Sequence, residues 1–378
     1  METIAIVSVL SFAAWLYLAG LHGRFWRSTP ALPHRAPSGR AGVAVVVPAR
    51  NEAANICRSL ESLFAQDYPG ELSIVLVDDD STDGTSQIAA SLAAGRRLTI
   101  LRGEPLPMGW TGKMWAVHQG LAHPGVTAAD YVLLTDADVV HAPDHLSSLV
   151  AKAQSGALDL VSEMVRLHCT TAAERALIPA FVFFFQMLYP FAWVADPARR
   201  TAGAAGGTML LSRTILDRIG GVFRIRNQLI DDCALAREIK SAGGRIWLGH
   251  TQRAASTRVC SWRGAGNMIA RTAYAQLLYS PLLLLSCIAA MIAIYVAPPL
   301  LALFACGLAQ ALGILSWLIM ALAFQPTLRL YRRSPLWGLA LPLIALFYLC
   351  ATVASALRHY AGRGGAWKSR VYPIPPAA

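Results

Sequence analysis

Two aspartates, Asp136 and Asp138, follow the apolar run 131–134 and are separated by a single alanine. Carboxylates two residues apart in a turn can face one hard cation together, directly or through water. Mg²⁺ and Mn²⁺ favour oxygen ligands, and Mg²⁺ typically takes one or two carboxylates together with substrate phosphates. The spacing therefore favours a metal site, with a solvated turn as the alternative for this pair taken alone.

Three further acidic clusters lie at the end of an apolar run or at the start of a helical pattern. They are VVVPARNE (45–52) with Glu52, LVDDDSTDGT (76–85) with Asp78, Asp79 and Asp80, and LIDDCAL (229–235) with Asp231 and Asp232. Singly, each has a structural alternative: a helix cap, an acidic turn, or acids favoured by a helix dipole. Together, the four clusters match the needs of a nucleotide donor, namely contacts for base and ribose, a metal for the diphosphate, and a base for an acceptor hydroxyl.

Apolar runs that alternate with helical patterns must position these acids between about residues 43 and 249. Continuously apolar strands separated by helices predict an α/β domain with a mostly parallel sheet covered on both faces. Ligands of such sheets bind beyond the carboxyl ends of the strands, where the acidic clusters occur. The predicted strands are 43–47, 73–77, 98–101, 131–135, 158–161 and 208–211.

The composition excludes an ordinary soluble enzyme, because 55% of the residues are hydrophobic and only 15% are charged. The formal net charge is +11. Much of the arginine flanks apolar stretches, which favours a lipid bilayer surface over nucleic acid as the partner. The seven cysteines are scattered, so neither a disulfide framework nor a zinc site is indicated.

Long uncharged runs at both ends of the chain predict membrane helices. Residues 3–21 are long enough to span a bilayer, and 281–324 is about twice one span, with Pro298-Pro299 and Gly307 as places to turn. A further helix is predicted at 336–357. The sequence thus divides into an anchor (1–24), an α/β domain (40–265), a membrane region of about three helices (281–357) and a basic tail (358–378).

Basic residues that follow the first span place that side in the cytoplasm. Four spans would then place the basic tail outside, against the same tendency, and the alternative is that one segment is re-entrant or interfacial. The aromatic segment 181–193 is short for a span and fits an interfacial segment, with a buried helix as the alternative.

The motifs VVVPARNE, VDDDSTDGT, GKMWA (112–116), TDADV and the Asp231–Asp232 pair occur in the order typical of family 2 glycosyltransferases, which the chain resembles. The layout of anchors and RVCSWRG (258–264) resemble the membrane-bound ceramide-glucosyltransferase-type branch. The carboxyl-terminal GRGGAWKSRVYP is similar to bacterial hopene-associated glycosyltransferases. The resemblance implies a Rossmann-like GT-A domain with transmembrane helices at both ends, in the bacterial inner membrane, with the catalytic domain cytoplasmic.

The same resemblance implies residues that bind the nucleotide-sugar donor. Pro48, Arg50 and Glu52 would border the nucleoside pocket, and Asp79 would contact the base. Lys113 would lie near the donor.

For the reacting groups, the resemblance implies that Asp136 approaches the ribose or the sugar and that Asp138 binds Mn²⁺ or Mg²⁺. Asp232 would be the general base of a single displacement that inverts the anomeric centre. The residues implied on the acceptor or diphosphate side are Asp231, Arg258, Trp262 and Arg263.

The sequence therefore predicts transfer of a sugar from a nucleotide-diphosphate-sugar, with a UDP-sugar favoured, to a membrane lipid at the cytoplasmic face. A hopanoid or another isoprenoid or sphingolipid-like lipid is the implied acceptor. Two alternatives remain: a processive polysaccharide synthase, and a non-catalytic membrane scaffold that binds nucleotide sugar. His118, His168 and His250 are candidate ligands or bases, although a structural role is the more common one for an isolated histidine.

Overall fold

An eight-stranded mixed sheet forms the centre of the α/β domain in this computed structural model, which describes residues 2–29, 32–364, 366–367 and 370–371. The strand order is β3-β2-β1-β4-β7-β6-β8-β5. The strands are β1 (Val43–Ala49), β2 (Leu72–Asp78), β3 (Leu98–Arg102), β4 (Tyr131–Leu134), β5 (Val139–His141), β6 (Leu160–Arg166), β7 (Met209–Ser212) and β8 (Ile246–Ser256). A separate short pair is formed by β9 (Ala366–Trp367) and β10 (Arg370–Val371).

Parallel pairing joins β1 to β2 and β4, β2 to β3, and β6 to β8. The prediction of a mostly parallel sheet is confirmed, and β7 runs antiparallel between β4 and β6. All seven residues of β1 are buried, as expected for a central strand covered on both faces. Two strands of the sheet, β5 and β8, were not predicted from the sequence.

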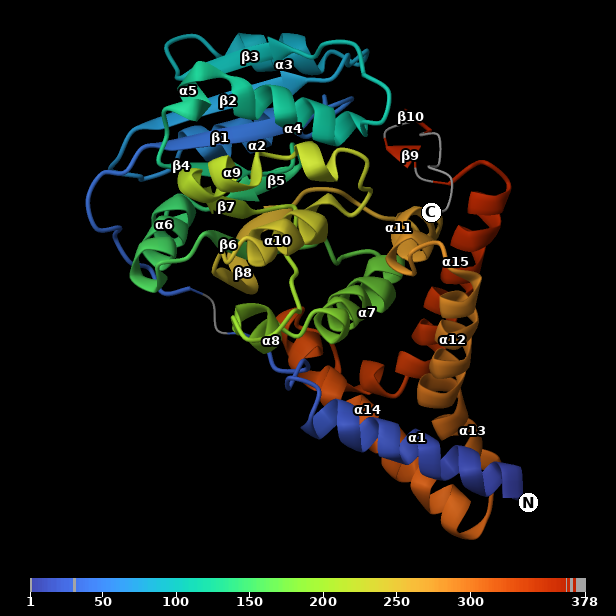
Figure 1. Cartoon of the computed structure of the whole chain (residues 1–378). Helices are drawn as coiled ribbons and strands as arrows, with labels where there is room; N and C mark the ends of the chain where they lie inside the picture. The colour runs from blue at the N-terminus through green and yellow to red at the C-terminus, as the bar shows by residue number, and fades with distance from the viewer. Residues whose placement is uncertain (1, 30–31, 365, 368–369, 372–378) are drawn as a thin grey trace.

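Helices cover both faces of this sheet (Figure 1). Residues of α4, α9 and α10 pack into the core cluster on one face, and residues of α2, α3 and α6 pack into the cluster on the other. The helices of the domain are α2 (Ile56–Phe64), α3 (Thr85–Leu92), α4 (Gly112–Ala122), α5 (Pro124–Thr127), α6 (His145–Gly156), α8 (Phe191–Ala195), α9 (Arg213–Ile219), η1 (Phe223–Ile225) and α10 (Asp231–Ser241).

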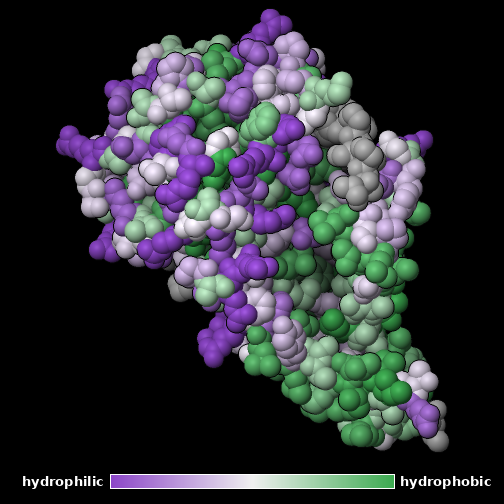
Figure 2. All heavy atoms as spheres, in the orientation of Figure 1, coloured by the Kyte–Doolittle hydropathy of each residue, from purple (hydrophilic) through white to green (hydrophobic). Residues whose placement is uncertain are grey.

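Four helices are long and apolar enough to cross a membrane. They are α1 (Glu2–Gly20), the continuous run of α12 (Pro281–Met291), η2 (Ile292–Val296) and α13 (Ala297–Phe304), α14 (Gly307–Leu330), and α15 (Leu341–Tyr360). Figure 2 shows hydrophobic residues gathered over this lower part of the molecule and hydrophilic residues over the α/β domain. Apolar helices at both ends of the chain are thus confirmed.

The turn between the second and third of these helices lies just before Gly307, whose φ is +58°. Pro298 and Pro299 do not turn the chain; they lie in the first turn of α13, where proline is tolerated. A short helix, η3 (Pro335–Gly338), then precedes α15. The predicted basic tail lies only partly within the described residues, and Lys368 is outside them.

Two helices connect the α/β domain to the membrane helices. Along α7 (Ala172–Leu188), Ile178 and Val182 pack into the core of the domain, whereas Phe183 and Phe184 pack among the membrane helices. The aromatic segment 181–193 is therefore largely a buried helical segment, which is the alternative to the interfacial prediction. The second helix, α11 (Trp262–Gln276), packs along α15.

Candidate active site

A cavity of about 1070 Å³ lies beyond the carboxyl ends of β1 and β4 and extends between α7, α11 and α15. Its polar end contains residues from the first, third and fourth acidic clusters. Its other walls are mainly apolar, with Phe181, Phe184 and Phe185 from α7, Met268 from α11 and Tyr348 from α15. The residues at this polar end include Pro48, Arg50, Glu52, Lys113, Asp136, Asp138, Asp232 and Arg258. One continuous space thus joins the predicted donor residues to the membrane helices.

Lys113 connects the third and fourth clusters. Thr111 caps α4 and accepts a hydrogen bond from Met114, so Lys113 extends from the first turn of the helix. Its Nζ lies 3.0 Å from Asp136 Oδ1 and 3.0 Å from Asp231 Oδ2. Burial alone would lower the pKa of Lys113, but the carboxylates of Asp136, Asp231 and Asp232 raise it above its usual range. Lys113 is therefore a fixed positive charge between two acidic clusters.

Arg258 connects the first and third clusters. Its Nε lies 3.0 Å from Asp138 Oδ2, and its terminal nitrogen lies 2.8 Å from Glu52 Oε1. The hydroxyl of Ser256 donates to the same Asp138 oxygen at 2.9 Å. Burial would lower the pKa of Arg258, and the two carboxylates raise it. The end of β8 thus supplies the partner that holds Asp138 in place.

Asp232 has the environment expected of a general base. Burial and the neighbouring Asp231 raise its pKa to about 6, although Lys113 and two backbone N–H groups lower it. Those N–H groups donate from Cys233 to Oδ1 at 2.7 Å and from Gly206 to Oδ2 at 3.0 Å. At neutral pH the group is an oriented carboxylate that is more basic than an ordinary aspartate, as proton abstraction requires.

The glycine-rich segment before β7 brings backbone close to the Asp232 carboxylate. A Cβ placed on Gly206 would lie only 3.4 Å from Lys113 Nζ and 3.5 Å from Asp232 Oδ2. These are ordinary van der Waals distances, so the backbone at Gly206 lies directly beside both charged groups. In the structure this segment approaches Asp232, with the Gly206 N–H 3.0 Å from Oδ2.

The three consecutive aspartates of the second cluster have different environments. Asp78 accepts hydrogen bonds from Ser81 N–H at 3.1 Å and from the Ser86 hydroxyl, so it closes the turn before α3. Asp79 is 1% exposed, and its Oδ2 lies 3.5 Å from Nη1 of Arg50, which lines the cavity. Asp80 is exposed and has a φ of +56°. Asp79 thus contacts a cavity-lining residue without lining the cavity itself, and its contact with the base stays a prediction.

The carboxylate oxygens of Asp136 and Asp138 suit a divalent cation that is also bound by a substrate. Within the described residues, no group of three or more His, Cys, Asp or Glu side chains has the geometry of a complete metal site. The Asp138 carboxylate contacts Ser256 and Arg258 through Oδ2, and the carboxylates of Glu52, Asp136 and Asp232 line the same cavity. Mg²⁺ and similar ions commonly take one or two carboxylates and complete their coordination with phosphates. Asp138 and Asp136 could hold a metal in this way.

Four other residues that the sequence singled out are described by the structure but do not line the cavity. Trp262 and Arg263 begin α11 without lining the cavity, and the Trp262 ring contacts Phe347 at a centroid distance of 6.1 Å. His118 packs among tryptophans, and His168 contacts Glu174. The structural interpretation fits both histidines.

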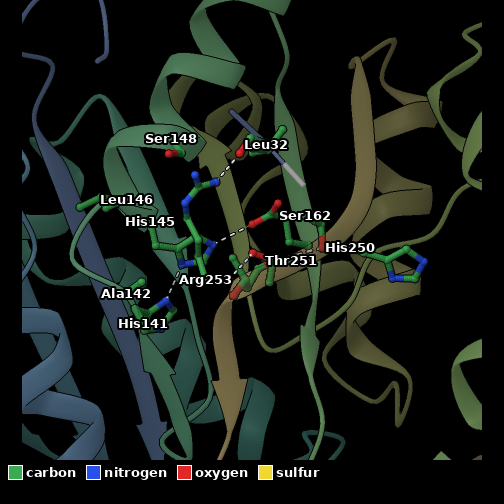
Figure 3. Close-up of polar contacts among 12 residues, drawn as sticks. Leu32, His141, Ala142, His145, Leu146, Ser148, Ser162, His250, Thr251 and Arg253 are labelled. Atoms are coloured by element: carbon green, nitrogen blue, oxygen red, sulfur yellow. Dashed lines mark hydrogen bonds and ion pairs between the residues drawn. The ribbon is translucent and has the colours of Figure 1, made fainter. Parts of the chain in front are cut away.

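His250 is also structural, because it packs on Phe191 and burial lowers its pKa to about 4. Sequence reasoning missed Ser256 and Gly206, which fix Asp138 and Asp232. Gly206 could have been found from its glycine-rich setting, whereas no local signal marks Ser256. A buried pair, His141 and His145, was missed as well (Figure 3).

Residues 44–220 match the family model for glycosyl transferase family 2. This segment, a little under half of the chain, is therefore similar to the domain of that family. Along 98% of the chain the fold resembles that of the mannosyltransferase PcManGT from Pyrobaculum calidifontis, solved in complex with GDP-Man and Mn²⁺, with 99% of that chain covered, a TM-score of 0.58 and 22% identity. The GT-A-like fold predicted from the sequence is thereby confirmed.

Two curated relatives match parts of the chain. A 4,4′-diaponeurosporenoate glycosyltransferase of Staphylococcus haemolyticus is 31% identical over 97 residues, which cover 26% of this chain and 24% of that protein. A beta-monoglucosyldiacylglycerol synthase of Nostoc sp. is 32% identical over 186 residues, which cover 47% of this chain and 37% of that protein. The chain thus spans well under half the length of these relatives.

Proposed function

We propose that the protein transfers a sugar from a nucleotide-diphosphate-sugar to the hydroxyl of a membrane lipid, with inversion at the anomeric carbon. One observation carries the proposal: a single cavity joins the acidic clusters and Asp232 to an apolar volume among α7, α11 and α15. A soluble acceptor would not need apolar walls continuous with membrane helices. The names of the two relatives, which refer to a diaponeurosporenoate and a diacylglycerol, also support a lipid acceptor.

Each charged group has a role in this proposal. Pro48, Arg50, Glu52 and Asp79 border the nucleoside, and Asp136 orients the ribose or the sugar. A Mn²⁺ or Mg²⁺ ion held by Asp138 would neutralise charge on the leaving diphosphate.

On the acceptor side, Asp232 takes the proton of the lipid hydroxyl, and Gly206 N–H keeps the receiving carboxylate oriented. Lys113 holds positive charge beside Asp136 and Asp231. Because the displacement is direct, no covalent nucleophile is needed.

The finer assignments are part of the same proposal. The acceptor is a hopanoid or another isoprenoid or sphingolipid-like lipid, as in the ceramide-glucosyltransferase-type branch. The enzyme is placed in the bacterial inner membrane, with its α/β domain on the cytoplasmic side, where basic residues such as Arg24 and Arg27 follow α1.

The test is donor-dependent transfer by purified protein in lipid, with UDP-, GDP- and dTDP-sugars in Mn²⁺ or Mg²⁺. We expect one sugar to be added to a lipid and a UDP-sugar to be the preferred donor. Asp138→Ala is expected to abolish the transfer, while Asp217→Ala, on the exposed surface of α9, keeps it. A folded Asp138→Ala protein with full activity would overturn the proposal, and a ladder of long products would favour a processive synthase instead.

A further inference from the structure

Four polar side chains form a buried line beneath the active site. Glu163 Oε2 lies 2.7 Å from His145 Nε2, His145 Nδ1 lies 2.9 Å from His141 Nδ1, and His141 Nε2 lies 3.0 Å from Thr135 Oγ1. The Thr135 hydroxyl then donates to the Gly207 carbonyl at 2.8 Å. None of the four residues is more than 4% exposed, and Figure 3 shows the two imidazole rings lying against each other.

The hydrogen bonds fix the direction in which the protons point. Because the single proton of the Thr135 hydroxyl goes to Gly207, its oxygen must accept from His141 Nε2–H. Burial and the neighbouring His145 lower the pKa of His141 well below its usual range, so its ring is neutral and its Nδ1 accepts from His145 Nδ1–H. One proton is then shared between His145 and Glu163. Every donor from His145 Nδ1 onward points toward Gly207.

The line ends at the two backbone segments that carry the chemistry. Thr135 immediately precedes Asp136 at the end of β4, and Gly207 immediately follows Gly206, whose N–H orients Asp232. Ser162, next to Glu163 on β6, reinforces the second segment: it accepts from Ala205 N–H at 2.9 Å and donates to the Thr208 carbonyl at 3.0 Å. The metal-side turn and the base-side loop are thus joined through the Thr135 hydroxyl.

We propose that Glu163, His145, His141 and Thr135 are positioning residues for sugar transfer, which set the Gly206 N–H against Asp232 and the turn that carries Asp136 and Asp138. This inference rests on the proposed function, since it assigns Asp232 as the base. A buried acid and two buried histidines are expensive to retain where apolar residues would fill the same space. Their common proton direction provides what apolar packing lacks, namely a directional restraint on one carbonyl.

The test compares Thr135→Val with Thr135→Ser, because valine has the shape of threonine without its hydroxyl. If the Gly206 bond to Asp232 weakens, the pKa of Asp232 rises, because that bond lowers it. We therefore expect Thr135→Val to lower kcat about 10-fold and to move the acid limb of the kcat/KM profile to higher pH. Thr135→Ser is expected to keep the wild-type limb. The charged and titratable groups that face Asp232 are Asp231, Lys113, Cys233 and Tyr189, and they are unchanged in both variants.

A second pair of variants, both at Glu163, tests the end of the line that lies away from the sugar-donor site. In Glu163→Gln the side-chain amide can still donate to His145 Nε2, so we expect the acid limb of the kcat/KM profile to stay at its wild-type pH. The methionine of Glu163→Met cannot donate a hydrogen bond, so we expect its acid limb to shift as in Thr135→Val. This pair decides the matter if Thr135→Val does not fold.

The inference would be overturned if folded Thr135→Val or Glu163→Met protein kept the wild-type acid limb of the kcat/KM profile. It would also be overturned if these variants lost thermal stability and active fraction while the acid limb stayed at the same pH. The proposed function is judged separately, by whether the wild-type protein transfers sugar and Asp232→Asn does not.

Discussion

Arg258 and Asp138 are 120 residues apart in the sequence, yet Arg258 Nε lies 3.0 Å from Asp138 Oδ2. The contact arises because β5 pairs with β8, with Val139 opposite Ser256. Asp138 directly precedes Val139, and Arg258 follows Ser256 by two residues, so the strand pairing brings the two side chains together. The same guanidinium reaches Glu52 at 2.8 Å. Arg258 therefore links Glu52 of the first acidic cluster to Asp138 of the third, and both contacts depend on its planar fork.

This geometry predicts that Arg258→Lys lowers transfer. A lysine ammonium is a point charge on a flexible chain and cannot hold both carboxylates with two directed bonds. We expect kcat/KM for the donor to fall about 10-fold, measured with a saturating lipid acceptor. Arg213→Lys, in the surface pair with Asp217, is the matched control and should change nothing. An Arg258→Lys enzyme with wild-type kinetics would mean that charge alone suffices at this position.

Asp232→Asn should separate chemistry from donor binding. The asparagine carbonyl can still accept from Gly206 N–H, so the local structure is retained, but the side chain cannot take a proton. We expect kcat to fall at least about 100-fold, while the dissociation constant of the donor changes little. Turnover is measured by lipid product and donor binding by calorimetry, with Asp217→Asn as the control. Loss of donor binding would show that Asp232 belongs to the donor site instead.

Much of this fold is local in origin and is therefore predictable from the sequence. β1, β2 and β4 are continuously apolar, and the helix 56–64 has a single apolar face, so both patterns are visible within a few residues. Asp136 and Asp138 follow the end of one such strand, and Asp232 starts a helix, so these acids are expected at the same edge of the sheet. The membrane helices follow from length and hydropathy alone.

The missed features depend on distant parts of the chain. β5 has three residues, and β8 mixes Gly249, His250 and Arg253 with apolar residues, so neither pattern marks a strand until each pairs with the other. His141 and His145 lie four residues apart, but only the folded chain brings them to their other partners, Thr135 after β4 and Glu163 on β6. The direction of β7 is likewise set by its neighbours β4 and β6 and not by its own residues.

Transfer should depend on pH through Asp232. Burial and Asp231 raise the pKa of this carboxyl to about 6. Above that pH the group is ionised and can accept the acceptor's proton; below it the group is protonated and cannot. We expect kcat/KM for the lipid to fall about tenfold per unit as pH drops below about 6. A profile that stays flat down to pH 5, in protein that remains folded, would contradict the assignment of Asp232 as the base.

Glu174 should stabilise the segment that carries Arg258. Its carboxylate accepts from Cys260 N–H at 2.6 Å and from Thr171 N–H at 2.9 Å, which joins α7 to the residues after β8. Burial alone would raise the pKa of Glu174, but these bonds and His168 lower it to about 2. Because the folded-state pKa is below the unfolded value of 4.5, the stabilisation is complete above pH 4.5 and is lost as the pH falls toward 2.

Glu174→Gln is therefore expected to lower the free energy of unfolding by on the order of 2–3 kcal/mol at neutral pH. It should also flatten the dependence of stability on pH between 4.5 and 2. Thermal unfolding followed at several pH values checks both points, with Glu238→Gln on the surface of α10 as the control. An unchanged pH dependence would mean that Glu174 is not ionised in the folded protein.

The apolar part of the cavity should select the acceptor without affecting the donor. Ala273 on α11 lines this part, whereas Ala275, two residues further along the same helix, does not. A phenylalanine at 273 would fill space that the lipid needs, so we expect Ala273→Phe to raise the KM for the lipid about 10-fold or more, because several buried methylenes of the acceptor would lose their site. The donor dissociation constant should stay the same, and Ala275→Phe should leave both values unchanged. Equal effects of the two substitutions on lipid KM would argue that α11 matters for packing alone and that the acceptor enters by another route.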